Sequence, residues 1–407
     1  MTAAPRRHGS AIAAAALAEA LATLLAGVLA AAVSACSPAV KDDPGGPSRD
    51  DDPVAQTSPA TPGNGTAPGH AVPGHATAPG PASHFHLLPV RGPGHLAPGS
   101  NPAALPGDVL IADEDNNRLL LVDPRGRIRW QFPGRGGLSR GQGFALPDDA
   151  FISPDGATII ATQEQDDAVS LIDIASGHIT RRYGHPGVPG AAPGFFSHPD
   201  DAMMLAGGDL LVPDIMNCRI FLFSPGRWHV IRRFGTTGSC GHHPPTLFGS
   251  PNGAFPLSDG HFLITEINGD WVDEMSLSGR VSWSAHPPGV AYPSDANQIG
   301  TGRYVVADYS YPGQIVVFNR TGHPLWRFRP TGAGALNHPS LALPLPGGNI
   351  LVNDDYNHRV IVVSTKTGRI VWQYGHTGVA GRAAGYLNNP DGVDLAPPYS
   401  LLQTSLP

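Results

Sequence analysis

Carboxylate, amide and imidazole side chains recur beside a proline that returns about every forty to fifty residues. Oxygen ligands suit a hard cation such as Ca²⁺, whereas imidazole favours a transition metal. The candidate metal ligands are Asp148, His198, Asp200, Asp201, Asp295, His338 and Asp391. Alternatively, each Asp only caps the turn after its proline by accepting hydrogen bonds from backbone N–H groups. Residue type and spacing leave both interpretations open.

The prolines mark six units of similar sequence. They are Pro147, Pro199, Pro251, Pro293, Pro339 and Pro390, and an Ala or Val follows each one after three positions. Each unit continues with short apolar runs separated by Gly, Pro, Asn and Asp, a pattern typical of small strands. Four such strands per unit predict an all-β, six-bladed β-propeller with antiparallel blades. Six-fold geometry would then gather the candidate ligands around the mouth of the central channel.

The two ends of the repeat region complement each other. Residues 105–132 supply three strands but lack the strand that opens the other units, and residues 389–397 supply one such strand with nothing after it. Pairing this last strand with the first three would close the ring and protect its edges. We therefore predict a propeller over residues 105–397, followed by a C-terminal tail at 398–407.

A second group of reactive side chains is Cys218 and the segment "SCGHHPP", which contains Cys240, His242 and His243. Both cysteines are expected at the same end of the propeller, and an exported protein meets oxidising surroundings. We predict a Cys218–Cys240 disulfide. Free thiols and a Cys/His metal site are the alternatives, although the spacing matches no zinc-ligand pattern.

Three units share a polar cluster between their second and third strands. It reads "DEDNNR" at 113–118, "DIMNCR" at 214–219 and "DDYNHR" at 354–359. Recurrence favours architecture over catalysis, since a catalytic site is normally built once. We interpret the cluster as a turn in which Asn takes the left-handed conformation and Arg binds neighbouring carboxylates. The chain contains no GxSxG nucleophile motif and no GxxxxGKS phosphate loop.

The N-terminal part has the composition of a leader and a tether. Residues 1–35 combine a basic start, an apolar stretch and a small-residue end, as in a secretory signal, and Cys36 follows Ala35 as in a bacterial lipoprotein signal. An uncleaved anchor or an ordinary signal peptide are the alternatives. Residues 36–104 are rich in Pro, Gly and Ala and predict a disordered tether. The expected location is the outer face of the bacterial cell membrane, with Cys36 lipidated.

Two units, "FSHPDDAMMLAGGDLLVPDIMNCRIFLFSPG" and "LNHPSLALPLPGGNILVNDDYNHRVIVVSTKTG", resemble NHL repeats, and "TGRIVW" and "RGRIRW" resemble pyrroloquinoline-quinone-type propeller repeats. The first resemblance implies either a binding scaffold or a metal-dependent lyase or lactonase, so it fixes no activity. We carry no quinone cofactor over from the second.

The function that we expect is an exported, membrane-tethered binding or scaffold module. It would bind a protein or small-molecule ligand on the face that carries the long loops. The alternative is a metal-dependent enzyme, similar to a lyase or lactonase, with Ca²⁺ or another divalent metal in the central channel. The net charge of −7 argues against nucleic acid as a partner, and a monomer is expected.

Overall fold

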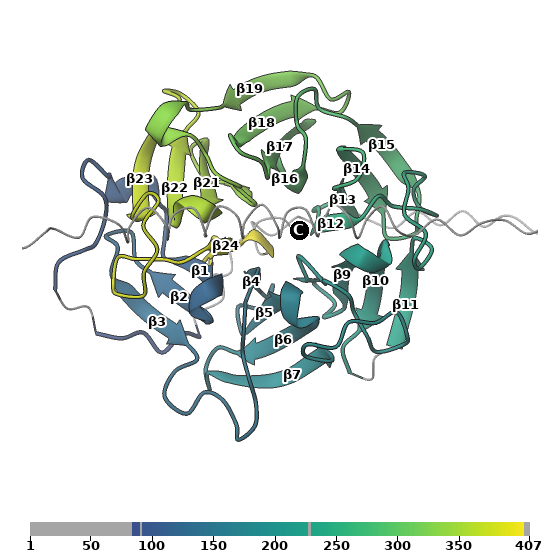
Figure 1. Ribbon diagram of the computed structural model, residues 1–407, viewed down its shortest axis with the longest axis horizontal. Coiled ribbons are helices and arrows are strands. Elements are labelled where there is room, and N and C mark those ends of the chain that lie inside the picture. The colour runs from purple at the N-terminus through teal and green to yellow at the C-terminus, as the bar shows by residue number, and fades with distance from the viewer. Residues whose placement is uncertain (1–83, 90–91, 227–228, 403–407) are drawn as a thin grey trace, which may run out of the picture. The chain divides into compact units, whose positions relative to one another are not determined.

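The computed structural model describes residues 84–89, 92–226 and 229–402. Their strands form six four-stranded antiparallel sheets arranged as blades around a central axis (Figure 1). The all-β, six-bladed propeller predicted from the repeats is therefore confirmed. The predicted signal, Cys36 and most of the tether lie outside the described residues.

Each blade has an inner strand at the channel and three strands that follow outward. Blades 1 and 2 are β24 (Pro390–Leu395), β1 (Val109–Asp113), β2 (Arg118–Val122), β3 (Ile128–Phe132), and β4 (Ala150–Ile152), β5 (Thr158–Gln163), β6 (Ala168–Asp173), β7 (His178–Gly184). Blades 3 and 4 are β8 (Met203–Met204), β9 (Leu210–Asp214), β10 (Arg219–Ser224), β11 (His229–Phe234), and β12 (Pro251–Pro256), β13 (His261–Glu266), β14 (Trp271–Ser276), β15 (Val281–Ala285). Blades 5 and 6 are β16 (Pro293–Gly300), β17 (Arg303–Asp308), β18 (Gln314–Asn319), β19 (Pro324–Phe328), and β20 (Ala342–Pro344), β21 (Asn349–Asp354), β22 (Arg359–Ser364), β23 (Arg369–Gly375).

The ring closes as predicted, because the last strand of the chain completes the first blade. β24 pairs antiparallel with β1, with Leu395 opposite Val109 and Val393 opposite Ile111. Without β24, the hydrogen-bonding edge of β1 would be open to solvent or to another chain.

Apolar side chains of neighbouring blades pack against one another to form the core. The second and third strands are rich in Val, Ile and Leu and are almost wholly buried, as in β22, because blades cover both faces of each sheet. Aromatic residues join blades at a distance in sequence. Trp372 is fully buried and donates its indole N–H to Pro124 O of blade 1 at 2.9 Å.

The polar cluster between the second and third strands forms a buried Asp–Arg ion pair in blades 1, 3 and 6, which we call the staple. In blade 3, Arg219 Nε donates to Asp214 Oδ2 at 2.7 Å, and the matching pairs Arg118–Asp113 and Arg359–Asp354 measure 2.6 and 2.7 Å. These side chains are at most 4% exposed. The predicted role of Arg is thus what the structure shows.

The prediction that Asn takes the left-handed conformation in this turn is confirmed in blade 1, at Asn117 with φ 53°, but is wrong in blades 3 and 6. Asn217 lies in a 3₁₀ turn (Ile215–Asn217), and the left-handed residue is the next one, Cys218, with φ 53°. The Asn217 amide instead donates to Asp214 at 2.9 Å and to Gly190 O, in the loop before the blade's inner strand, at 2.9 Å. The cluster therefore fastens a loop to a turn, and its Asp is not available for a ligand.

The described residues before 105, which were predicted to belong to a disordered tether, contact the propeller. Leu88 N donates to Arg129 O, and Ala97 N and Asn101 N donate to carbonyls of β23. Phe85 packs edge-on against Trp130, with ring centroids 5.1 Å apart. These residues cover the outer strands of blades 1 and 6.

Within the described part of the chain, no helix has the length and apolar character that a membrane crossing requires.

Candidate functional site

The candidate ligands sit where each inner strand begins, next to a backbone bend. The residue just before the recurring proline has positive φ in several blades: 56° at His198, 57° at Ser250, 55° at His338 and 53° at Asn389. This bend turns the chain from the long outer loop into the inner strand. The one or two residues after the proline then lie at the channel.

Seven carboxylates converge there and form a continuous chain of close contacts. Ligand oxygens lie within 4.8 Å of one another in three overlapping groups: Glu114, Asp148 and Asp391; Asp148, Asp149 and Asp200; Asp149, Asp201 and Asp295. Blades 1, 2, 3 and 5 contribute them. All seven side chains are buried, with at most 8% of their surface exposed. We call these seven residues the channel carboxylates.

Several of their oxygens have no hydrogen-bond partner within the described residues. They are Asp149 Oδ1, both oxygens of Asp201 and Asp295 Oδ1. Among the described residues, none of the channel carboxylates pairs with an Arg or Lys. One oxygen does meet the turn-capping geometry, since Asp200 Oδ1 accepts from Asp201 N at 2.8 Å. Turn capping therefore accounts for Asp200 but not for Asp201 or Asp295.

Burial and mutual repulsion raise the pKa of these groups. The pKa of Glu114 rises to about 8, first through burial and then through the charges of Asp391 and Asp115. Burial, followed by the charge of Asp295, raises the pKa of Asp201 well above its ordinary value. The pKa of Asp391 rises to about 6, with burial as the main cause. A buried site of this kind must take up either protons or a cation.

A small cavity of about 60 Å³ lies among these groups, lined by Asp148, Asp200 and Asp391 and by Glu164, Asn252, Tyr292, Ser294, Tyr309 and Ser340. Its polar lining comes from all six blades. The volume suits an ion with a few waters but is well below the roughly 300 Å³ at which small-molecule sites begin.

The two candidate histidines lie outside the channel carboxylates. His338 packs between Tyr309 and Tyr356, at 4.8 and 4.6 Å between ring centroids, and its Nδ1 lies 2.8 Å from Asn337 Oδ1. His198 Nδ1 lies 3.9 Å from Asp167 Oδ1, and its side chain is 38% exposed. The structure thus gathers five of the seven predicted residues, namely Asp148, Asp200, Asp201, Asp295 and Asp391, without the imidazoles.

Other acidic residues of the channel were missing from the predicted ligand set. Glu114 belongs to the channel carboxylates, and Glu164 lines the cavity. Asp355 is fully buried, and the pKa of its carboxyl is raised by burial and by Asp391. All three occupy one repeat position, directly after the second strand of their blade. Aligning that position across "ADEDNN", "TQEQDD" and "NDDYNH" would have identified them.

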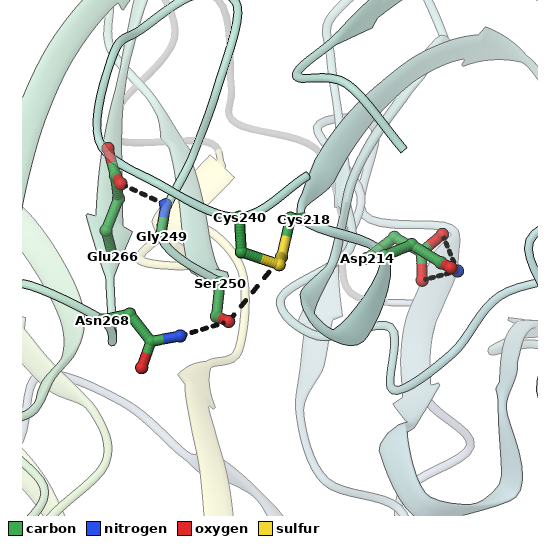
Figure 2. The surroundings of a disulfide bond; sticks show 8 residues. Asp214, Cys218, Cys240, Gly249, Ser250, Glu266 and Asn268 are labelled. Atoms are coloured by element: carbon green, nitrogen blue, oxygen red, sulfur yellow. Dashed lines mark hydrogen bonds between the residues drawn. A yellow bond between two sulfur atoms is a disulfide. The ribbon is translucent and has the colours of Figure 1, made fainter. Parts of the chain in front are cut away.

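The structure links Cys218 and Cys240 as a disulfide, with 5.3 Å between their Cα atoms (Figure 2). Cys218 ends the 3₁₀ turn of blade 3, and Cys240 lies in the loop that leads into blade 4. Ser250 Oγ lies 3.9 Å from Cys218 Sγ and accepts a hydrogen bond from Asn268 Nδ2 at 2.9 Å. The bridge fastens the long loop between β11 and β12 to the 3₁₀ turn of blade 3.

Comparison with known proteins gives one family match and several similar structures. Residues 249–388, about a third of the chain, match the family described as outer membrane protein assembly factor BamB. No curated protein matches the chain.

The similar structures are propellers of distant sequence. A protein of unknown function from Bacteroides caccae is 15% identical, with a TM-score of 0.49 over 71% of this chain and 98% of the other. A streptogramin B lyase is 16% identical, with a TM-score of 0.47 over 76% and 91%. Virginiamycin B lyase from Staphylococcus aureus is 14% identical, with a TM-score of 0.43 over 65% and 83%. At these values, no activity carries over to this chain.

Proposed function

We propose that this chain is an exported, membrane-tethered binding module whose central channel holds Ca²⁺ and whose loop-rich face binds a protein. The observation that carries the proposal is the set of seven buried channel carboxylates, which have no Arg or Lys partner in the described part of the chain.

The donor atoms favour a hard cation. Ca²⁺ takes six to eight oxygen ligands in a flexible geometry, and the channel offers carboxylate, amide and hydroxyl oxygens but no imidazole. Asp149, Asp201 and Asp295 are the strongest candidates, because one carboxylate oxygen of each lies within 4.8 Å of the others and each side chain has at least one oxygen without a partner in the described residues. A divalent ion would neutralise charges that otherwise repel in a low-dielectric site.

Binding is favoured over catalysis by the size of the channel cavity. A lyase or lactonase would need room for an organic substrate beside the ion, and about 60 Å³ does not provide it. The match of residues 249–388 to a family named for an outer membrane protein assembly factor supports a protein as the ligand. The anchored location rests on the sequence of residues 1–36.

Elemental analysis and thermal unfolding of the purified full chain test the ion. We expect about one Ca²⁺ per chain, and a melting temperature that falls with a chelator and recovers with CaCl₂. Asp201→Asn should weaken this response, whereas Asp259→Asn, at a carboxylate that is 57% exposed and outside the channel, should retain it. An ion-free protein whose unfolding ignores Ca²⁺ would refute the channel site.

Capture of exported proteins on the immobilised chain tests the ligand. We expect a partner that is retained with Ca²⁺ and released by chelation, and that Asp201→Asn retains poorly. If no protein is captured under either condition, the scaffold role is wrong even if Ca²⁺ binds.

A further inference from the structure

A second cluster of ligating side chains lies on blade 4 and shares no residue with the channel carboxylates. It consists of His242, from the loop between β11 and β12, Glu266, at the end of β13, and Asp273, in β14. We propose that these three residues bind a divalent transition-metal ion such as Zn²⁺. Nitrogen and oxygen donors with a position left open fit a borderline ion better than Ca²⁺.

The ligand atoms are close to the spacing that such an ion needs. His242 Nδ1 lies 2.9 Å from Glu266 Oε1 and 4.0 Å from Asp273 Oδ2, and all three atoms are within 4.8 Å of one another. Bonds of about 2.0–2.2 Å in a tetrahedron place ligand atoms roughly 3.3–3.5 Å apart. Small side-chain movements would therefore complete the coordination.

Blade 4 departs here from the buried Asp–Arg pair of blades 1, 3 and 6. Glu266 pairs across the strands with Trp271, at the positions where blade 3 has Asp214 and Arg219. Two residues further along, Asp273 replaces the buried Phe221 of blade 3. The blade has thus lost the Arg and gained a second buried carboxylate.

The protein offers few hydrogen-bond donors to the two buried carboxylates of this cluster. Asp273 is fully buried, and no donor meets hydrogen-bond geometry to either of its oxygens within the described residues. Ser284 of the neighbouring strand β15 (Val281–Ala285) lies opposite Asp273. Burial, with the neighbouring Glu266, raises the pKa of Asp273 to about 8. A metal ion, or a proton shared between Glu266 and Asp273, would reduce the repulsion between these two buried carboxylates.

The surroundings hold His242 and Glu266 in place for ligation. Glu266 Oε2 accepts a hydrogen bond from Gly249 N (Figure 2). The other oxygen, Oε1, lies 2.9 Å from His242 Nδ1. The His242 ring stacks on Trp271 with 4.0 Å between centroids and 5° between planes. The disulfide at Cys240 anchors the loop two residues earlier.

The His242 imidazole has the neutral form that a metal ligand needs, and solvent can reach it. Burial lowers the pKa of His242, so the ring is neutral near pH 7 and can act as a ligand. Its side chain is 22% exposed, which gives an ion a way in and leaves room for a water.

Titration of the full chain with Co²⁺, a spectroscopic substitute for Zn²⁺, tests this site in excess CaCl₂. Because the N-terminal segment carries histidines of its own, the readout is the difference between variants. We expect wild type and His323→Gln, a change at an exposed histidine, to share one visible absorption band that Zn²⁺ displaces. His242→Gln and Asp273→Asn should weaken the binding that produces this band at least about tenfold.

Two results would overturn the proposal. One is a band that survives unchanged in His242→Gln, a partly exposed position where folding should be preserved. The other is a wild-type protein without the band, in which Asp273→Asn alters only the pH dependence of unfolding, as a shared proton would require. The channel variant Asp201→Asn should keep the Co²⁺ band, so failure of the channel site and failure of this site are distinguishable.

Discussion

In the metal-free protein, the free energy of unfolding should fall as the pH rises from about 5 to about 8. The pKa of Glu114 is about 8 in the folded protein, against an ordinary 4.5, because of burial and of its acidic neighbours. The folded state therefore binds more protons than the unfolded state over this interval. The stability is fully present below about pH 4.5 and is lost as the pH rises through about 8.

The size of the effect follows from the shift. A difference of 8 − 4.5 = 3.5 pKa units corresponds to about 5 kcal/mol for Glu114, at 1.36 kcal/mol per unit. For Asp391, 6 − 3.8 = 2.2 units correspond to about 3 kcal/mol. The two carboxyls share the same neighbourhood and titrate together, so these figures do not add. A loss of about 3–5 kcal/mol is a large part of the stability of a typical domain.

Urea unfolding followed by tryptophan fluorescence measures this loss at about pH 5, 6.5 and 8, with a chelator and with excess CaCl₂. Ca²⁺ should restore stability mainly at pH 8, because only the ionised carboxylates bind it. Glu114→Gln should flatten the pH dependence of the chelated protein. Asp394, whose pKa rises to about 7 through burial, contributes a loss of the same sign, but its oxygens accept backbone N–H groups and should not respond to Ca²⁺.

A chelated protein whose stability is constant or rises between pH 5 and 8 would refute the argument for repelling channel carboxylates. A pH-dependent loss that CaCl₂ leaves untouched would keep the repulsion and refute the cation.

Three further predictions concern the scaffold. Arg359→Ala should destabilise the protein by about 3–5 kcal/mol in urea unfolding, because Asp354 stays buried without its partner; a loss below about 1 kcal/mol would contradict the staple. Deleting residues 389–407 removes β24 and should abolish cooperative thermal unfolding, so a truncated protein that melts like the full chain would disprove ring closure. Changing both Cys218 and Cys240 to Ser should cost about 3 kcal/mol for a bridge that spans 22 residues, and an unchanged melting temperature would show that the bridge contributes nothing.

The ring could be predicted from sequence because its information is local and repeated. Each unit carries the same proline, the same short apolar strands and, in three blades, the same Asp, Asn and Arg. These fix one blade, and six copies fix the propeller, including the strand that closes it. Local pattern also placed five channel carboxylates correctly, because equivalent positions of equivalent blades must meet at the axis.

The sequence could not predict which side chains point into the channel, because that depends on contacts between residues of different blades. His338 and Asp391 share the neighbourhood of a proline, yet the imidazole packs between Tyr309 and Tyr356 while the carboxylate joins the channel. His338 precedes its proline, at a residue with φ 55°, whereas Asp391 follows its proline, and spacing alone does not reveal which way each side chain points. Asn217 was misassigned for a related reason, since its amide partner Gly190 is distant in sequence.

Departures from the repeat are where a function specific to this chain can reside. Arg219 and Arg359 neutralise the buried Asp of their blades, so those carboxylates need nothing from outside the protein. Blade 4 has Trp271 at the Arg position and adds Asp273, so its buried charge is left to an imidazole, a proton or an ion. A repeat that only built a scaffold would have no reason to exchange a satisfied ion pair for an unsatisfied one. Blades 2 and 5 also lack the Arg, with Ala168 and Gln314 in its place, but blade 4 is where the structure gathers an imidazole and two buried carboxylates, beside the loop that the disulfide fixes. This coincidence is what makes a bound metal the more specific explanation.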